Sequence, residues 1–362
     1  MDKKRISFFL PALYGGGAEK VTINLLKGMV QRGVLCDLVL ASAEGPYLQQ
    51  VPQQVRIINF NAGRVIKAIL PLSNYLRQEK PKALISHLNH ANVVAILAKE
   101  LSSTQTRLVV VEHNTLSADQ GALWRGKLVP PLMKLLYPRA DAIVGVSQGV
   151  VQDLASYLKI AQEISVIYNP VVDDVLLSQA TAPLEHPWFQ EETPPVFLAV
   201  GRLSKQKDFL TLIKAFALLR SKRIARLMIL GEGEMRCELE DAIAKLDITQ
   251  DVALPGFVTN PYAYMKRASA FVLSSRWEGL PTVLIEAMAC GCPVIATDCP
   301  SGVREILDTG YGSLVPVEDV AAMSLAMQQT LDTSINKDRL IQRAMCFTID
   351  QVVPQYLTLL EQ

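Results

Sequence analysis

Residues 270–297 read AFVLSSRWEGLPTVLIEAMACGCPVIAT. The stretch begins with an apolar run of strand length, Ala270–Ser274, and ends with another, Pro293–Thr297. Between them Pro281 suits the first turn of a helix, and Gly291 ends that helix after about ten residues. Short strands that are apolar throughout are typical of parallel strands buried on both faces of a sheet. The stretch therefore predicts a strand–helix–strand unit of a parallel α/β sheet.

The same alternation of apolar runs and helical segments continues along the whole chain, which favours an α/β fold of two tandem Rossmann-like, doubly wound domains. Residues 173–195 hold four prolines and no clean periodicity, so we expect the connection between the domains there. The predicted strands are Ile6–Leu10, Cys36–Ala41, Val55–Phe60, Ala83–Ser86, Leu108–Glu112, Ala142–Val146 and Ile164–Tyr168 in the first half, and Val196–Val200, Leu227–Leu230, Val252–Leu254, Ala270–Ser274, Pro293–Thr297 and Ser313–Val315 in the second.

The composition is that of a globular protein, because the 362 residues are 50% hydrophobic and 20% charged. Six cysteines without a Cys-x-x-Cys pair are too few for a disulfide scaffold. The net charge of +1 conceals an asymmetry, since residues 1–180 carry a net +6 and residues 181–362 a net −5. This contrast indicates different partners for the two halves, and anionic lipid, nucleic acid and anionic substrates all suit a basic half.

The sequence predicts a cytoplasmic protein. No stretch reaches the roughly 18 uninterrupted apolar residues that a membrane span needs. The apolar run that follows Arg5 is short, lacks a small-residue cleavage site and leads into a glycine turn, which argues against a signal peptide. The scattered cysteines fit a reducing compartment.

A glycine-rich loop, LYGGGAE at residues 13–19, follows the first strand and opens a helix. Gly15, Gly16 and Gly17 allow close backbone approach, and a helix N-terminus offers free N–H groups to an anion. The loop is not the G-x-G-x-x-G fingerprint of dinucleotide sites. A plain strand-to-helix turn is the alternative interpretation.

A second loop, residues 200–208, again joins a strand to a helix and carries Arg202 and Lys207. A departing diphosphate group needs such cations, one a planar fork and one a point charge. Ligands of α/β sheets bind beyond the carboxyl ends of the strands, which is where this loop lies. An ordinary solvated loop is the alternative.

Two glutamates flank the start of the helix predicted within residues 270–297. Glu278 lies on the entry loop, and Glu286 lies within the helix among apolar residues. A carboxylate in such surroundings needs a polar partner, and a pair of ribose hydroxyls would serve. The free N–H groups at residues 280–283 suit phosphate oxygens. A structural glutamate paired with arginine or backbone is the alternative.

Taken together and in this order, the motifs resemble those of family 4 glycosyltransferases, which have the GT-B fold of two domains facing across a cleft. The resemblance covers nearly the whole chain and implies an acceptor-binding domain over residues 1–175, a donor-binding domain over 176–346 and a helix over 347–362 that crosses back to the first. The motifs are Gly16–Glu19, Glu112–Asn114, Val146–Gln148, Tyr168–Pro170, Gly201 and Arg202 with Lys207, Gly231–Gly233, Pro255–Phe257, and Glu278 separated by seven residues from Glu286.

The resemblance implies a role for each matching residue. Arg202 and Lys207 would bind the donor diphosphate, Glu286 the ribose hydroxyls, and Glu278 the donor sugar. His113 would lie beside that sugar, and with Glu278, Arg202 and Lys207 it forms the predicted catalytic group. The other predicted donor-binding residues are Gly16 and Gly17 at the phosphates, Gly231, Gly233, Phe257 and Val258 around the base, and Gly279, Leu280, Pro281 and Thr282 at the phosphate and sugar.

For enzymes of this kind the resemblance implies that the sugar keeps its anomeric configuration, that UDP is the carrier, and that neither a metal nor a cofactor is required. The residues agree, because cations and helix N–H groups stabilise a departing nucleoside diphosphate without a metal. The sequence also lacks an Asp-x-Asp motif. Front-face attack by the acceptor and a covalent intermediate on Glu278 both stay open.

The acceptor is expected to be a lipid-linked or cell-envelope glycan rather than a nucleic acid. Trp124–Arg139 mixes basic with apolar and aromatic residues, and the segment Val65–Leu76 adds Arg64, Lys67 and Arg77 beside apolar residues. Such segments suit peripheral contact with an anionic membrane surface, here its inner face. Ordinary amphipathic helices packed on their sheet are the alternative.

Two further functions compete with the transferase. The first is a GT-B-like sugar-nucleotide epimerase, which needs additional acids deep in the cleft. The second is a non-catalytic module that binds nucleotide sugars.

Other features have structural interpretations. We assign His87 and His90 to a loop or to the acceptor side rather than to a metal site. Cys290, Cys292 and Cys299 are expected to be buried, and the residues around Ser147 do not form a G-x-S-x-G nucleophile elbow.

Overall fold

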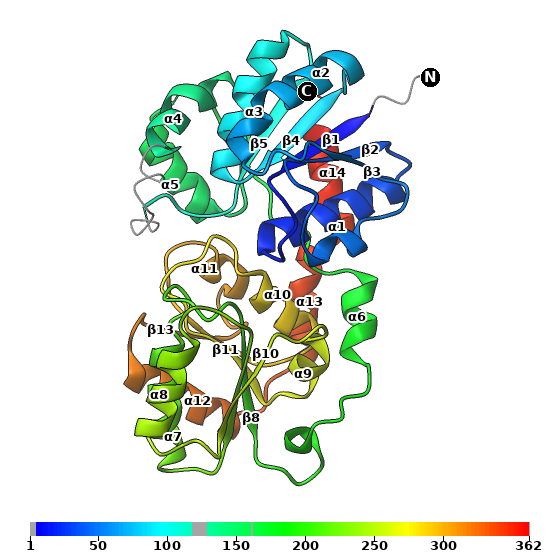
Figure 1. Cartoon of the computed structure of the whole chain (residues 1–362). Helices are drawn as coiled ribbons and strands as arrows, with labels where there is room; N and C mark the ends of the chain where they lie inside the picture. Colours follow the sequence, from blue (N-terminus) through cyan, green and yellow to red (C-terminus); the bar gives the residue numbers. More distant parts are fainter. Residues whose placement is uncertain (1–4, 118–128, 161, 362) are drawn as a thin grey trace. The chain divides into compact units, whose positions relative to one another are not determined.

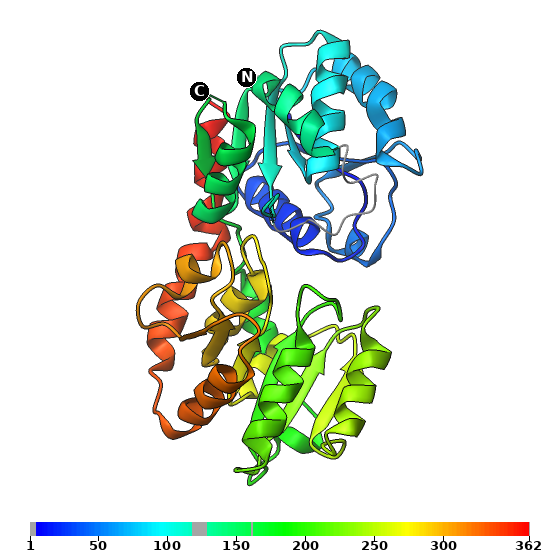
Figure 2. The same cartoon turned by 90° about the vertical axis from the view of Figure 1, so that its left-hand side faces the viewer.

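The structure, a computed structural model, describes residues 5–117, 129–160 and 162–361. The chain forms two compact units, one made of Met1–Val171 with Ile349–Gln362 and the other of Val172–Thr348. Each unit contains one parallel sheet with helices on both of its faces (Figures 1 and 2). The prediction of two doubly wound α/β domains is therefore confirmed.

The first unit has a seven-stranded sheet in the order β3-β2-β1-β4-β5-β6-β7. Helices α1 and α14 cover one face, and α2, α3 and α4 cover the other (Figure 1). The strands are β1 (Ile6–Leu10), β2 (Cys36–Leu40), β3 (Arg56–Asn59), β4 (Ala83–His87), β5 (Arg107–Glu112), β6 (Ala142–Gly145) and β7 (Ile164–Val166). The helices are α1 (Gly17–Gln31), α2 (Ile69–Glu79), α3 (Asn89–Ser102), α4 (Val129–Leu136), α5 (Gln148–Leu158) and α14 (Ile349–Leu359).

Helix α14 returns the end of the chain to the first unit, where it packs along α1. Gly28 of α1 makes this close packing possible, because a Cβ there would lie 2.6 Å from Cγ2 of Val353. At the edge of the contact, Arg32 Nη2 and Asp350 Oδ1 form an ion pair at 2.7 Å.

The second unit has a six-stranded sheet in the order β10-β9-β8-β11-β12-β13. Helices α7, α8 and α12 pack together on one face, and α9, α10 and α13 on the other (Figure 1). The strands are β8 (Val196–Val200), β9 (Arg226–Leu230), β10 (Val252–Gly256), β11 (Ala270–Leu273), β12 (Val294–Thr297) and β13 (Ser313–Val315). The helices are α6 (Asp174–Ala180), α7 (Phe209–Arg220), α8 (Arg236–Lys245), α9 (Tyr262–Arg267), α10 (Thr282–Ala289), α11 (Val303–Leu307), α12 (Val320–Asp332) and α13 (Lys337–Ala344).

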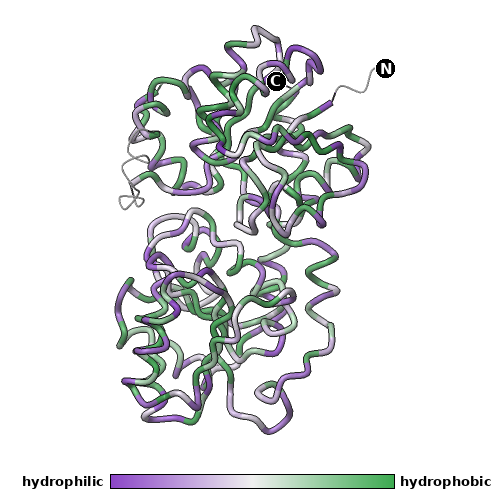
Figure 3. The backbone as a smooth tube through the Cα atoms, viewed as in Figure 1, coloured by the Kyte–Doolittle hydropathy of each residue, from purple (hydrophilic) through white to green (hydrophobic). Residues whose placement is uncertain are grey.

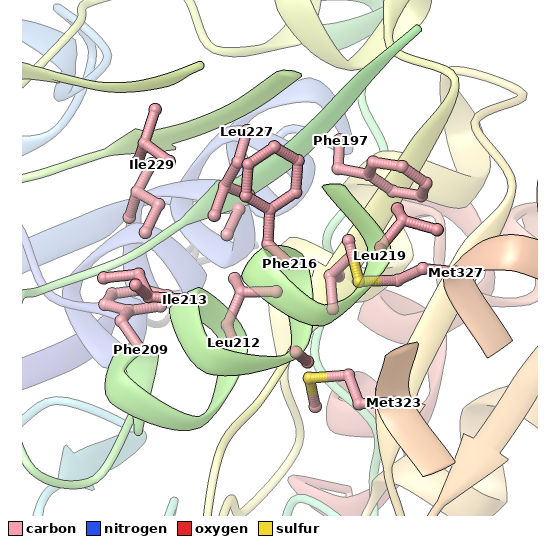
Figure 4. Close-up of a cluster of buried hydrophobic side chains, with 14 of the residues drawn as sticks. Phe197, Phe209, Leu212, Ile213, Phe216, Leu219, Leu227, Ile229, Met323 and Met327 are labelled. Carbon is pink, nitrogen blue, oxygen red and sulfur yellow. The ribbon is translucent and has the colours of Figure 1, made fainter. Parts of the chain in front are cut away.

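The core of the second unit lies between its sheet and the helices of one face (Figure 4). Phe216 of α7 is fully buried against Leu227 of β9, and Met323 and Met327 of α12 close the other side. The strands at the centre of each unit form the most hydrophobic stretches of the backbone (Figure 3). These rigid layers fix the positions of the loops that leave the carboxyl ends of the strands.

Two expectations about the sheet and its connections are wrong. Strand β3 is not buried on both faces, because it forms the edge of its sheet and three of its four residues are exposed. Residues 173–195 are not an irregular connection, since α6 packs on α9 and the rings of His186 and Phe189 pack against Tyr264. This stretch is therefore a folded part of the second unit.

Within residues 5–117, 129–160 and 162–361, no helix has the length and apolar character needed to cross a lipid bilayer.

Candidate active site

The carboxyl end of β8 is the switch point of the second sheet, because β8 lies between β9 and β11. In open α/β sheets, ligands bind at such a point, where neighbouring loops diverge. The loop after β8, residues 201–208, and the loop after β11, residues 274–281, meet here. The two charged loops predicted from the sequence therefore lie together at the switch point of the second sheet.

Hydrogen bonds join these two loops directly. Gln206 Nε2 donates to the carbonyl of Trp277 at 2.9 Å, and the backbone N–H of Arg276 donates to the carbonyl of Gln206 at 2.8 Å. Ser274 Oγ donates to the carbonyl of Lys207 at 2.7 Å. These hydrogen bonds hold the backbones of the two loops together, and the loops carry the charged side chains of the site.

Lys207 and Glu278 form an ion pair, with Nζ 2.6 Å from Oε1. Glu278 is buried, and Ser275 Oγ also donates to its Oε1 at 2.6 Å. A buried carboxylate is costly unless it is paired and hydrogen-bonded, and these two donors meet that requirement. An ammonium has three N–H donors, so Lys207 keeps capacity for a second anion.

Arg202 lies on the same loop, five residues before Lys207, and its side chain is exposed. It makes no hydrogen bond or ion pair to the residues that the structure describes. An exposed guanidinium on this loop that is not itself engaged is suited to bind an arriving phosphate in a bidentate manner.

Glu286 lies on α10 and is 9% exposed, with apolar residues on both sides of it in the helix. Pro281, the residue before the first residue of α10, is the N-cap of this helix and provides no side-chain cap. The first N–H groups of this helix therefore have no capping side chain, as an anion site requires. The neighbouring Gly279 carbonyl accepts a hydrogen bond from Ser301 Oγ at 2.9 Å.

Glycines bring the loops after β8, β9 and β10 into backbone contact. Gly231 has a φ of +142°, and a side chain there would clash with the carbonyl of Gly201. The N–H of Gly231 donates to the carbonyl of Gly256 at 2.8 Å, and a Cβ at Gly233 would lie 2.7 Å from the nitrogen of Leu203. We call the contact between these three loops the glycine seam. Next to it in the chain, Phe257 is 69% exposed and Val258 is half-buried.

The predicted donor-binding residues are therefore grouped by unit. Most of them belong to the carboxyl edge of the second sheet. These are Arg202, Lys207, Glu278, Glu286 and the loops around Gly231, Phe257 and Gly279–Thr282. Gly16, Gly17 and His113 belong to the first unit.

The glycine loop of the first unit is exposed at Gly16 and Gly17, and Gly16 is the N-cap of α1. The carboxylate of Glu19, in the first turn of α1, lies against Gly16, where an added Cβ would come within 3.2 Å of its Cδ. The N-terminus of α1 therefore already has an acidic side chain at the place predicted for phosphate.

His113 follows β5 and is buried, with its Nε2 atom 2.9 Å from Nδ1 of His87. Of the two places expected for His87, a loop or the acceptor side, the loop is wrong, because His87 is the fully buried last residue of β4 in the first unit. Its partner is not His90, which contacts Asn89. Burial lowers the pKa of His113 to about 4 and that of His87 well below its usual value, so both rings are neutral at pH 7.

Sequence reasoning missed a second buried group, at Glu112. Asn92 Nδ2 donates to Glu112 Oε1 at 2.8 Å, and the Tyr137 hydroxyl donates to the same oxygen. Burial raises the pKa of Glu112 to about 7, although both hydrogen bonds act in the opposite direction. Glu112 belongs to the predicted motif Glu112–Asn114, but nothing in the sequence shows that its carboxylate points into the fold.

The raised pKa of Glu112 predicts how stability depends on pH. Between its ordinary value of 4.5 and about 7, the folded protein binds more protons than the unfolded chain, so stability falls as pH rises through this window. Replacing Glu112 with glutamine removes that fall. We expect the free energy of unfolding of wild type, relative to Glu112→Gln, to decrease by about 2–3 kcal/mol between pH 5 and pH 8.

Urea denaturation at several pH values measures this difference. Glu100→Gln is the matched control, because Glu100 is exposed and pairs with Arg139 on the surface. Parallel pH profiles for wild type and Glu112→Gln would contradict the assignment of a buried, titrating carboxyl.

Comparison with known sequence families gives two matches that together span most of the chain. The family described as Glycosyltransferase Family 4 matches residues 15–175. The family described as Glycosyl transferases group 1 matches residues 184–345.

Individual relatives match over almost their full length. The N-acetylgalactosamine-N,N'-diacetylbacillosaminyl-diphospho-undecaprenol 4-alpha-N-acetylgalactosaminyltransferase of Campylobacter jejuni is 32% identical over 350 residues, which cover 93% of this chain and 92% of the relative. The lipopolysaccharide core biosynthesis glycosyltransferase LpsE of Rhizobium meliloti is 26% identical over 95% of this chain and 96% of the relative.

Solved structures with the same fold include HepE of Anabaena in complex with UDP, with a TM-score of 0.80 and 19% identity over 99% of both chains. The lipopolysaccharide outer core galactosyltransferase WaaB has a TM-score of 0.74 and 21% identity, over 97% of this chain and 98% of its own. The two sheets, the two family matches and the 32% identical relative lead to one conclusion: the chain belongs to the family 4 glycosyltransferases and is a glycosyltransferase with the GT-B fold.

Proposed function

We propose that the protein transfers a sugar from a UDP-sugar to a hydroxyl of a lipid-linked or cell-envelope glycan, with retention of the anomeric configuration. One observation carries the donor part of this proposal. At the switch point of the second sheet, Lys207 pairs with a buried Glu278 while Arg202, on the same loop, keeps its guanidinium unengaged by described residues. The loop therefore carries two cations whose N–H groups are not all used within the protein, and a diphosphate requires such hydrogen-bond donors.

In the proposed complex, the diphosphate binds Arg202, Lys207 and the N–H groups at the start of α10. Charge that develops on the departing nucleoside diphosphate is met by groups that are already oriented, so no metal or other cofactor is needed for that step. Glu286 binds the ribose hydroxyls, and the seam of loops around Gly231, Gly233 and Phe257 surrounds the base. The solved neighbour HepE, in complex with UDP, supports UDP as the carrier.

The environment of Glu278 favours front-face attack over a covalent intermediate. A nucleophilic carboxylate must approach the anomeric carbon with a free oxygen. The ion pair with Lys207 and the hydrogen bond from Ser275, both made at Oε1 of Glu278, lower the nucleophilicity of the whole carboxylate, including Oε2, to which no described residue is hydrogen-bonded. We therefore propose that Glu278 contacts the donor sugar and that a phosphate oxygen accepts the proton of the acceptor hydroxyl.

Relatives support the acceptor class. The Campylobacter jejuni relative that is 32% identical acts, by its name, on a sugar linked to diphospho-undecaprenol, and a second relative from that organism, 25% identical over 99% of this chain, also carries an undecaprenol-linked acceptor in its name. An acceptor with a long polyprenyl tail resides at a membrane, so an enzyme that uses it must work at that surface.

The first unit offers a surface of suitable chemistry. Ile66, in the short 3-10 helix Val65–Ala68, and Leu70, in the first turn of α2, are 55% and 66% exposed, and the basic residues Arg64 and Lys67 lie beside Ile66 in the chain. On α4, Leu135 is 62% exposed beside Lys134. Exposed apolar residues among cations match an anionic bilayer interface. The first part of the predicted segment Trp124–Arg139, residues 124–128, lies outside the described residues.

This surface predicts binding to vesicles that contain anionic lipid. We expect co-sedimentation with phosphatidylglycerol vesicles, weakening as salt rises, and little with neutral phosphatidylcholine vesicles. The double variant Ile66→Ser, Leu70→Ser should lower binding several-fold. Ile224→Ser is the matched control, since Ile224 is 69% exposed in the second unit. Equal recovery with neutral and anionic vesicles would contradict membrane contact.

Thermal unfolding in the presence of a panel of nucleotide sugars tests the donor. A ligand that binds only the folded state raises the apparent Tm, so we expect UDP-sugars to stabilise the chain more than GDP-sugars. Stabilisation by none of them would contradict the donor proposal. Turnover of the donor without any acceptor would indicate an epimerase, and binding without turnover on any acceptor would indicate a non-catalytic module.

A further inference from the structure

Two buried histidines meet at the carboxyl edge of the first sheet. His87 ends β4, His113 follows β5, and these strands are parallel neighbours in which His87 pairs with Val111. Nδ1 of His87 lies 2.9 Å from Nε2 of His113. One proton must occupy this contact, because two neutral ring nitrogens form a hydrogen bond only when one of them carries hydrogen.

The other nitrogen of His87 decides where that proton lies. Nε2 of His87 is buried and has no hydrogen-bond partner among the described residues. If His113 donated, the proton of His87 would sit on this nitrogen and leave a buried N–H unpaired. If His87 donates from Nδ1, its Nε2 is only an unused acceptor, which is the less costly of the two. His113 then accepts at Nε2 and carries its own proton on Nδ1.

The surroundings hold His87 in place. Its ring stacks on that of Phe8 from β1, with centroids 6.2 Å apart and planes 9° apart. Leu88, the next residue, has a φ of +78°, a conformation that bulky residues adopt only where the surroundings enforce it. The carbonyl of Leu88 accepts from the N–H of Asn92 at 2.8 Å, and the Asn92 side chain donates to the carbonyl of Val111 in β5 at 3.1 Å.

We propose that His87 is a positioning residue that keeps the proton of His113 on Nδ1, so that His113 presents a fixed N–H to a hydroxyl of the donor sugar. For the identity of the group that His113 meets, the proposal rests on the proposed function and on the place beside the donor sugar that the family resemblance implies for His113. The tautomer itself follows from the contacts within the first unit.

Nitrogen NMR of the intact protein, labelled with ¹⁵N in its histidine rings, tests the tautomer without any substrate. The chain has four histidines, so single variants assign the signals. We expect a protonated Nδ1 and an unprotonated Nε2 for His113. In His87→Phe, which keeps a ring against Phe8 but removes the donor, His113 should shift towards the Nε2–H form. His87→Asn, whose amide replaces the Nδ1 donor, should restore the wild-type pattern, and His90→Asn should leave it unchanged. An Nε2–H signal for His113 in the wild type would overturn the proposal.

Binding measurements test the role. Because His113 would meet the sugar and not the nucleotide, His87→Phe should weaken a UDP-sugar by about fivefold to tenfold and leave UDP unchanged. His87→Asn should recover most of this loss. Unchanged affinity for the UDP-sugar in His87→Phe would overturn the positioning role. A chain that binds neither UDP nor UDP-sugar would refute the proposed function, while the NMR result would still decide the tautomer. If His87→Phe does not fold, the NMR signals of His113 in the wild type and in His87→Asn still decide the tautomer.

Discussion

Arg202→Ala and Lys207→Ala are each expected to lower kcat/KM for the donor by about 10²–10³, the loss that follows removal of one preorganised group that stabilises developing charge. Arg202 is the cleaner probe, because it is exposed and makes no bond to described residues, so its removal disturbs nothing in the free protein. Lys207 also compensates the buried Glu278, and its loss therefore costs stability as well as rate.

The two effects of Lys207 can be separated. In Lys207→Ala, Glu278→Gln, the uncompensated charge is absent, so stability should recover while the donor kinetics stay impaired. Lys205→Ala is the matched control, since Lys205 is an exposed lysine on the same loop without a described partner. Steady-state kinetics and thermal unfolding measure both quantities. Rates close to wild type for Arg202→Ala and Lys207→Ala would refute the diphosphate assignment.

Glu286→Ala is expected to weaken binding of UDP by about 10²-fold, because two hydroxyl hydrogen bonds to a buried carboxylate are lost. The change should appear in the dissociation constant more than in kcat, since the ribose is remote from the reacting bond. Isothermal titration with UDP measures it.

Comparison with 2′-deoxy-UDP localises the contact. The deoxy compound should bind wild type more weakly than UDP does, whereas Glu286→Ala should bind both equally. Glu238→Ala controls for the loss of an acidic residue, because Glu238 is exposed on α8. An unchanged dissociation constant for UDP in Glu286→Ala would remove the ribose role.

The sequence predicted best those features that depend only on neighbouring residues in the chain, such as the positions of the strands. Every strand of both sheets lies within one or two residues of an apolar run, because a parallel strand covered on both faces must be apolar throughout. The places of Arg202 and Glu278 at one edge also followed, since loops after neighbouring parallel strands leave the sheet on the same side. The edge strands were the exception, because burial depends on which strands have a neighbour on both sides. Strand β3 is mostly exposed, and the other edge strands, β7, β10 and β13, are buried only in part.

Side-chain partners over long sequence separations could not be predicted. His87 and His90 share helical spacing, yet His87 binds His113 across two strands whose adjacency only the sheet order defines. The same holds for Glu112, which meets Asn92 and Tyr137 from two other elements. The packing of α6 on α9 was hidden by the prolines that follow α6. Motif glycines such as Gly231 are explained by backbone packing against Gly201, a constraint that the sequence does not show.

The most direct test of the proposed activity is the configuration of the product. The protein is incubated with UDP-N-acetylgalactosamine or another UDP-sugar that stabilises it, a polyprenyl-diphosphate-linked glycan and a chelator, and the new glycosidic bond is analysed by NMR. Metal-independent transfer that preserves the α configuration of the donor sugar is the predicted result. An inverted product, or transfer abolished by the chelator, would contradict the proposal.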